Sequence, residues 1–173
     1  MRFLFVLLLI APAAWAETCP PIAPWPESYG VLMEQIRVAP DEKTARNLSN
    51  EAWRHWVRAP DTYAQELLDT GMERRSAFDF EGAHIAFDAL VNYCPDYAEG
   101  YNQRAFVAFL RGNFAPALSD LEVAIRLVPD HFAAHSGRAL TLMNMGRVEE
   151  GQIALKEALA LNPWLPERHM LIP

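Results

Sequence analysis

The sequence predicts an all-α fold in which antiparallel helix pairs stack into a solenoid. Pro95, Pro129 and Pro163 recur with a 34-residue period, and Gly112 and Gly146 share this period. Between these positions, apolar residues recur at the spacing of one helix face. A fixed period of this length is typical of repeated helical hairpins, because one hairpin cannot bury its apolar face without a neighbour.

Length and composition indicate one globular unit with a substantial core. The chain has 173 residues, of which 51% are hydrophobic and 21% charged. Its formal net charge is -7, and no cluster of Lys and Arg is present. Nucleic acids and anionic membranes attract clustered positive charge. We therefore expect neither as a partner.

Residues 1–16 have the pattern of a secretory signal peptide. Arg2 is followed by an apolar run and by the small-x-small sequence AWA, which predicts cleavage before Glu17. The alternative is a retained membrane anchor, but the run is shorter than the roughly 20 residues that a spanning helix needs. We expect an exported protein that does not insert into a membrane after cleavage. It would be periplasmic in a bacterium and secreted otherwise.

Export affects the interpretation of the two cysteines. Cys19 and Cys94 are the only possible intramolecular pair, and an oxidising compartment favours a disulfide between them. The bridge would fix the proline-rich segment 17–27, which otherwise favours an extended and loosely held conformation. The alternative is two unpaired thiols, one exposed and one buried.

The sequence of residues 28–60 predicts an N-terminal helical hairpin, whose two helices are separated at Pro40. Leu48, Ala52, Trp53 and Trp56 form an apolar stripe on its second helix, and we assign both tryptophans to packing. The hairpin is either a degenerate repeat or a cap on the repeats that follow.

Three frames of equal length follow, at 64–97, 98–131 and 132–165, and a tail covers 166–173. In the middle frame, two apolar stripes flank a break at Gly112. Alanines in both stripes would let the paired helices approach closely, with Leu121 filling the space between them. Each frame therefore predicts two helices joined by a tight turn.

The proline near the end of each frame marks the end of the second helix, because it cannot donate an amide hydrogen bond. Asp96 and Asp130 follow two of these prolines. We expect both carboxylates to cap the next helix, and Asp96 with Glu99 has the spacing of a capping box.

At these positions the chain resembles the tetratricopeptide repeat family over about residues 64–165. The resemblance rests on the recurring proline, glycine and alanine positions, and it implies a right-handed superhelix of three repeats. Gly151 and Leu90 depart from the family's usual alanine, and Arg104 and Arg138 stand where leucine is commoner. We interpret these arginines as structural, with Asp120 as a candidate partner.

The resemblance also implies a concave groove lined by the first helix of each repeat. The groove would be apolar with an amide edge, and an apolar peptide or amphipathic helix would fit it. Its expected residues are Leu68, Met72, Asn102, Gln103, Phe106, Phe109, Leu110, Ser136, Leu140, Met143 and Asn144. The family's carboxylate clamp is absent, because its positions hold Leu68, Met72, Gln103, Ala133 and Gly137. An acidic C-terminal tail is therefore expected to bind poorly.

No motif indicates catalysis, a cofactor or a metal. The sequence lacks a phosphate-binding glycine loop, CxxC, CxxCH and HExxH, and no nucleophile, base and orienting group can be assigned. His131 and His135 are four positions apart, but we expect one to be solvated and one to pack, rather than to share a metal.

The predicted function is a non-enzymatic adaptor that binds a protein or peptide outside the cytoplasm. The alternative is a carrier that holds a small apolar ligand or cofactor in the same groove. Either terminal segment, the proline-rich stretch or residues 162–173, could also fold back into the groove. We expect the C-terminal stretch instead to cover the exposed face of the last helix pair, because solenoid ends need a cap.

Overall fold

The computed structural model describes residues 18–172, and the predicted signal peptide, 1–16, lies outside these residues. The described part contains α-helices, one short 3-10 helix and no strands. The all-α fold class predicted from the sequence is therefore confirmed. Within the same residues, no helix combines the length and the apolar character needed to cross a membrane.

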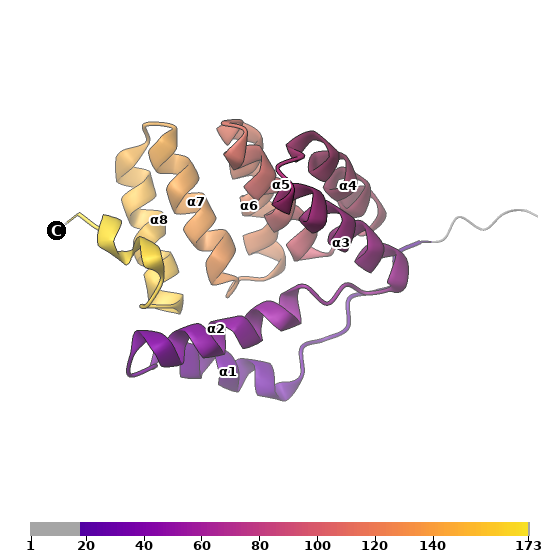
Figure 1. The fold of residues 1–173 in the computed structure, drawn as a ribbon. Coiled ribbons are helices and arrows are strands. Elements are labelled where there is room, and N and C mark those ends of the chain that lie inside the picture. The colour runs from indigo at the N-terminus through magenta and orange to yellow at the C-terminus, as the bar shows by residue number, and fades with distance from the viewer. Residues whose placement is uncertain (1–17, 173) are drawn as a thin grey trace, which may run out of the picture.

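Three antiparallel helix pairs stack in chain order, and Figure 1 shows them side by side along the solenoid. Small alanines on α5 and α6 pack around Leu121, as the sequence predicts. Gly151 replaces the usual alanine because a β-carbon there would lie 2.4 Å from the Met143 side chain. The pairs are α3 (Thr62–Ser76) with α4 (Phe80–Tyr93), α5 (Ala98–Leu110) with α6 (Phe114–Leu127), and α7 (Phe132–Asn144) with α8 (Val148–Leu161).

The expected caps at Asp96 and Asp130 are wrong. Both aspartates lie in the turn before the helix, and the N-cap positions fall one residue later, at Tyr97 and His131. His131 caps α7 by accepting the Ala134 amide at its Nδ1. Asp130 accepts a hydrogen bond from the Tyr29 hydroxyl instead, at 3.1 Å.

Arg104 pairs with Asp120 of its own repeat, as the sequence predicts, and also with Asp88 of the preceding repeat. Its guanidinium donates to both oxygens of Asp120, at 2.8 and 2.7 Å, and to Asp88 at 2.7 Å. Arg138 forms a close ion pair with Glu157 on α8. Both arginines therefore have structural partners.

The N-terminal hairpin does not stack as another repeat. Its helices α1 (Glu27–Arg37) and α2 (Glu42–Trp56) run across one end of the repeat helices (Figure 1). Buried side chains of α1 and α2 share a core with Phe132 of α7, Ala158 of α8 and Leu165 of the tail. The hairpin thus reaches the last repeat and closes one edge of the solenoid.

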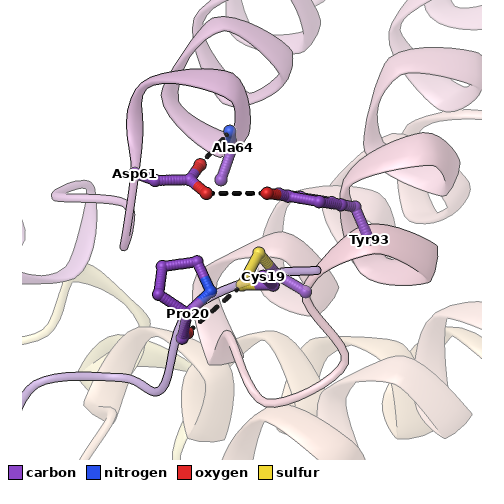
Figure 2. Close-up of a disulfide and its surroundings, with 6 residues drawn as sticks. Cys19, Pro20, Asp61, Ala64 and Tyr93 are labelled. Atoms are coloured by element: carbon purple, nitrogen blue, oxygen red, sulfur yellow. Dashed lines mark hydrogen bonds between the residues drawn. A yellow bond between two sulfur atoms is a disulfide. The ribbon is translucent and has the colours of Figure 1, made fainter. Parts of the chain in front are cut away.

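A disulfide joins Cys19 to Cys94, whose Cα atoms are 5.1 Å apart (Figure 2). Cys94 ends α4 and is fully buried, and the bridge holds the proline-rich segment against the core of the first repeat. Beside it, the Tyr93 hydroxyl donates to Asp61, whose other oxygen caps α3 by accepting the Ala64 amide. The expected bridge is therefore present, next to the start of the first repeat.

The segment that follows α8, residues 162–172, lies against α8 and also against the hairpin, and we call this segment the tail from here on. The Gln152 side chain donates to the Met170 carbonyl at 3.0 Å and accepts the Ile172 amide at 2.8 Å. The Trp164 indole donates to the Ala39 carbonyl at 2.9 Å. A 3-10 helix, Pro166–Met170, lies between these contacts. The tail covers the last helix, as expected, and also contacts the loop between α1 and α2.

Candidate functional site

A cavity of about 340 Å³ lies on the concave side, between α5 and α7. Phe106 and Phe109 of α5 and Leu140 of α7 form apolar walls. Trp53 of α2 and Leu165 of the tail supply further walls. We call this cavity the concave pocket. Because the hairpin and the tail help to bound it, it is more enclosed than a groove lined only by repeat helices.

Six of the predicted groove residues line the concave pocket. They lie on two neighbouring first helices of the repeats, as the resemblance implies. They are Asn102, Gln103, Phe106 and Phe109 on α5, and Ser136 and Leu140 on α7.

The other five predicted residues do not line this pocket. Leu68 is fully buried in the core of the first repeat, and Met72 packs against that core. Met143 packs against the core between α7 and α8. Leu110 and Asn144 are exposed at the far ends of their helices. The groove assignment is wrong for Leu68, because a fully buried side chain cannot contact a ligand. The other four residues lie outside the concave pocket, and their assignment to a wider groove stays a prediction.

Several residues that line the pocket are not among those predicted from the sequence. Trp53, Leu165 and Glu167 are contributed by the hairpin and by the end of the chain, where the 34-residue period carried no signal for the groove. Arg75 is different, because it precedes Phe109 by one full period, which would itself have placed it in the groove. Trp53 was assigned only to packing, but it also lines the pocket.

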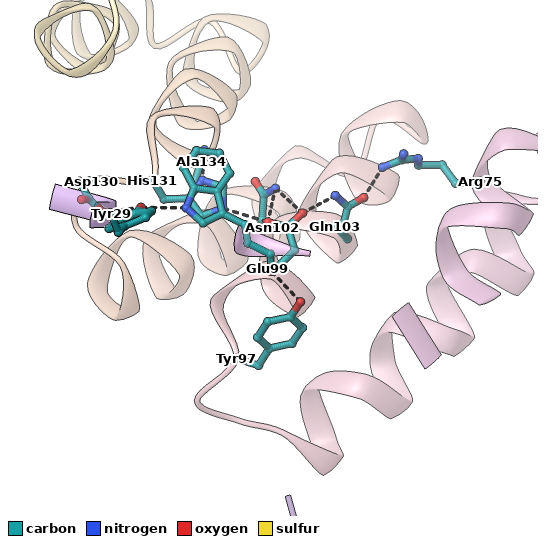
Figure 3. A network of polar contacts seen from close by, with 10 residues as sticks. Tyr29, Arg75, Tyr97, Glu99, Asn102, Gln103, Asp130, His131 and Ala134 are labelled. Carbon is teal, nitrogen blue, oxygen red and sulfur yellow. Dashed lines mark hydrogen bonds and ion pairs between the residues drawn. The ribbon is translucent and has the colours of Figure 1, made fainter. Parts of the chain in front are cut away.

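A chain of polar contacts runs from Arg75 into the protein (Figure 3). Arg75 donates to the Gln103 side-chain oxygen in a close hydrogen bond, and the Gln103 amide donates closely to Glu99. The Arg75 guanidinium also lies over the Phe106 ring, 4.9 Å from its centroid. Burial lowers the pKa of Arg75, and the negative charge of Glu99 partly opposes this shift. Glu99 thus compensates the charge of Arg75 through an intervening amide.

Glu99 also pairs with His131, and both side chains are fully buried. Because His131 Nδ1 accepts the Ala134 amide, its Nε2 carries the proton and donates to Glu99 at 2.9 Å. His135 is also buried, with Nε2 2.9 Å from the Pro129 carbonyl. The expectation that one of these histidines is solvated is therefore wrong, because α7 packs both against other elements.

His131 also connects the repeats to the hairpin. The Trp56 ring stacks on His131 with centroids 3.8 Å apart, and its indole donates to the Tyr29 hydroxyl at 2.9 Å. The Tyr97 hydroxyl donates to the Trp56 carbonyl at 2.7 Å. Burial raises the pKa of both the Tyr29 and the Tyr97 phenols, so they remain hydrogen-bond donors. These contacts fix the hairpin beside the pocket.

Two polar atoms among the pocket residues lack partners. Ser136 Oγ and Glu167 Oε2 are both shielded from solvent and make no hydrogen bond. Buried polar groups are normally satisfied, so unpaired ones need a physical explanation. Both belong to residues that line the same apolar pocket.

A larger cavity of about 730 Å³ lies under the proline-rich segment. Its lining is mixed, with Trp25, His55, Arg58 and Asp96 among the residues. None of the predicted groove residues lines it, so the concave pocket is the stronger candidate. Across residues 18–172, no cluster of three or more potential metal-binding side chains occurs.

Comparisons with known proteins agree with this architecture. No protein-family model matches the chain. A TPR repeat-containing protein of Rhizobium etli is 32% identical over 131 residues, covering 72% of this chain. The chain spans only 60% of the length of that relative.

Solved structures of low sequence identity share the fold. The TPR2B domain of yeast Sti1, in a complex with pHsp70, matches 64% of this chain and 91% of its own, with 20% identity and a TM-score of 0.60. The first TPR domain of Spaghetti, bound to the HSP90 peptide SRMEEVD, matches 62% of this chain and 85% of its own, with 22% identity and a TM-score of 0.60.

Proposed function

Because the chain belongs to the tetratricopeptide repeat family, we propose that it is a non-enzymatic adaptor that binds a protein partner through the concave pocket. The observation that carries this proposal is an aromatic-walled pocket on the face where the repeat helices α5 and α7 meet. Aromatic anchors in such pockets commonly supply most of the binding energy at protein interfaces.

The partner contributes apolar side chains from an extended peptide segment. Trp53 of the hairpin and Leu165 line the pocket together with the repeat helices, and its volume of about 340 Å³ is that of a few side chains rather than of a whole helix. An extended segment can place one or two side chains between them. The sequence is compatible with either an apolar peptide or an amphipathic helix as the ligand. The size of the pocket favours the extended peptide.

We place this activity outside the cytoplasm. The signal-peptide pattern of residues 1–16 supports export. The bridge between Cys19 and Cys94 supports the same proposal, because structural disulfides persist mainly in oxidising compartments.

Phe106→Ala tests the binding site. Peptides selected from a displayed random library against the purified protein are expected to be rich in Phe and Leu, and to bind this variant at least about tenfold more weakly. Leu110→Ala is the matched control, because Leu110 lies on the same helix, is 43% exposed against 46% for Phe106, and does not line the pocket. If Phe106→Ala and Leu110→Ala lose equal peptide affinity, the concave pocket is not the binding site.

Phe109 is a poorer test position. Its ring packs partly against the core of the second repeat and lies 5.5 Å from the ring of Phe114. Truncation at this position would reduce stability as well as binding.

A small apolar ligand is the second candidate, because the pocket volume falls within the usual range for small-molecule sites. Native mass spectrometry of protein purified from its exporting host distinguishes the peptide-binding adaptor from the small-molecule carrier. A retained small molecule that is lost in Phe106→Ala would favour the carrier, and a ligand-free protein that binds the selected peptides would favour the adaptor.

A further inference from the structure

We infer that the concave pocket selects a ligand with a positive charge beside an apolar or aromatic group, and that Glu167 holds this charge. The inference rests on the proposed function and specifies the chemistry of the bound peptide. Its basis is the balance of charge among the residues that line the pocket.

Two charged side chains line the concave pocket, Arg75 and Glu167. The charge of Arg75 is already satisfied within the protein. It donates to Gln103, lies over the Phe106 ring and is compensated by the buried Glu99. A ligand carboxylate would therefore have to compete with existing partners of Arg75.

Glu167 has no such compensation. Among the described residues it takes part in no ion pair, and its Oε2 is shielded from water without accepting a hydrogen bond. The adjacent Arg168 turns away, donating to Glu42 at 3.0 Å and to the Trp164 carbonyl at 3.0 Å. A carboxylate oxygen that is shielded from water and accepts no hydrogen bond is costly unless a donor reaches it. A cationic ligand group would supply that donor.

Ser136 provides an independent indication. It is 5% exposed, and its Oγ has no hydrogen-bond partner although its residue lines the same pocket. A hydroxyl can accept a hydrogen bond from a ligand N–H. An ammonium group carries three donors, so a lysine in the pocket can donate to more than one acceptor.

The apolar walls suit the rest of such a ligand. Aromatic rings attract cations and also pack against the methylene stem of a lysine. Trp53, Phe106 and Phe109 supply these rings around the pocket. An apolar peptide that includes a lysine therefore complements both the walls and the unpaired carboxylate.

Three matched peptides test the inference: acetyl-Phe-Leu-Phe-X-amide, with X as lysine, norleucine or glutamate. We measure their affinities by isothermal titration calorimetry at low and high salt. The lysine peptide should bind about tenfold more tightly than the norleucine peptide, because a charge-assisted hydrogen bond forms. The glutamate peptide should bind most weakly. The lysine preference should shrink at high salt.

Glu167→Gln should reduce the lysine preference, which is the ratio of the affinity of the lysine peptide to that of the norleucine peptide, to nearly one. Glu51→Gln removes the same charge from an exposed position on α2 and should leave the preference intact. Because Glu167 makes no ion pair that the variant would lose, its thermal stability should not fall. If the variant nevertheless fails to fold, the salt dependence of the lysine preference in the unchanged protein still decides the question.

The outcomes separate the two proposals. Equal binding of all three peptides, with loss in Phe106→Ala, would overturn the charge selection and leave the binding pocket in place. Tighter binding of the glutamate peptide would also overturn the charge selection. Failure of every peptide to bind would overturn the peptide pocket, and the inference with it.

Discussion

Phe78 and Gly112 occupy equivalent turn positions in successive repeats, and both adopt a left-handed backbone, with φ of 61° and 74°. Gly146 continues the series with φ of 78°. Glycine adopts this conformation without strain, whereas a bulky side chain does so rarely. The first repeat therefore keeps the turn geometry of the others with an unfavourable residue, and the Phe78 side chain is 82% exposed.

Phe78→Gly should stabilise the protein, by up to about 1 kcal/mol, because relief of backbone strain exceeds the added flexibility of the unfolded chain. Gly112→Ala is the converse variant and should destabilise by about 1 kcal/mol. A β-carbon at Gly112 meets nothing within 4 Å, so only the backbone conformation contributes. Urea denaturation measures both changes, and a destabilised Phe78→Gly would show that the aromatic ring stabilises the turn.

Loss of the disulfide should lower the free energy of unfolding. The bridge joins residues separated by 75 positions, and the chain-entropy estimate for such a loop is about 4 kcal/mol as an upper figure. Cys19→Ser is the preferred variant, because Cys94 is fully buried and its replacement would also disturb packing. Non-reducing peptide mapping of exported protein should show the linked pair, and two free thiols in that material would contradict the structure.

Removal of the hydrogen bond between His131 and Glu99 should be strongly destabilising. In His131→Phe the buried Glu99 side chain loses the Nε2–H donor of a neutral imidazole, and a buried charged acceptor left without its donor costs about 1–3 kcal/mol or more. His169→Phe, at an exposed position, is the control. Urea denaturation measures the loss of stability. Hydrogen exchange of His131→Phe should also show weaker protection of the α2 amides, because the Trp56 ring on α2 stacks on His131. If only the α7 amides lose protection, His131 does not couple α7 to the hairpin.

Stability should fall on mild acidification because of His135. Burial lowers the pKa of this imidazole below its usual 6.5, so the folded state resists a proton that the unfolded state accepts. Its contribution is complete above pH 6.5 and is lost as pH falls from there toward the lower folded-state pKa. Urea denaturation between pH 7.5 and about 5 measures the slope. His135→Gln should remove part of this slope, and an unchanged slope would exclude His135 as its source.

The repeat helices were predictable because their signals are local. The 34-residue spacing of prolines and glycines, together with apolar stripes of helical period, places three helix pairs where the structure has them. The sequence also identified the only possible disulfide partners and the pairing of Arg104 with Asp120. Six of the eleven predicted groove residues follow from the same register.

Only the tertiary structure decided what surrounds the groove. The hairpin lies across the repeats through contacts such as Tyr29 with Asp130, which are 101 residues apart, and the tail reaches Glu42 from Arg168, 126 residues away. These contacts also determine that Trp53 and Glu167 line the concave pocket. A helical period records which face of a helix is apolar, but it does not record which distant segment covers that face. That choice depends on shape, burial and pairing of polar groups between segments that meet only in the folded chain.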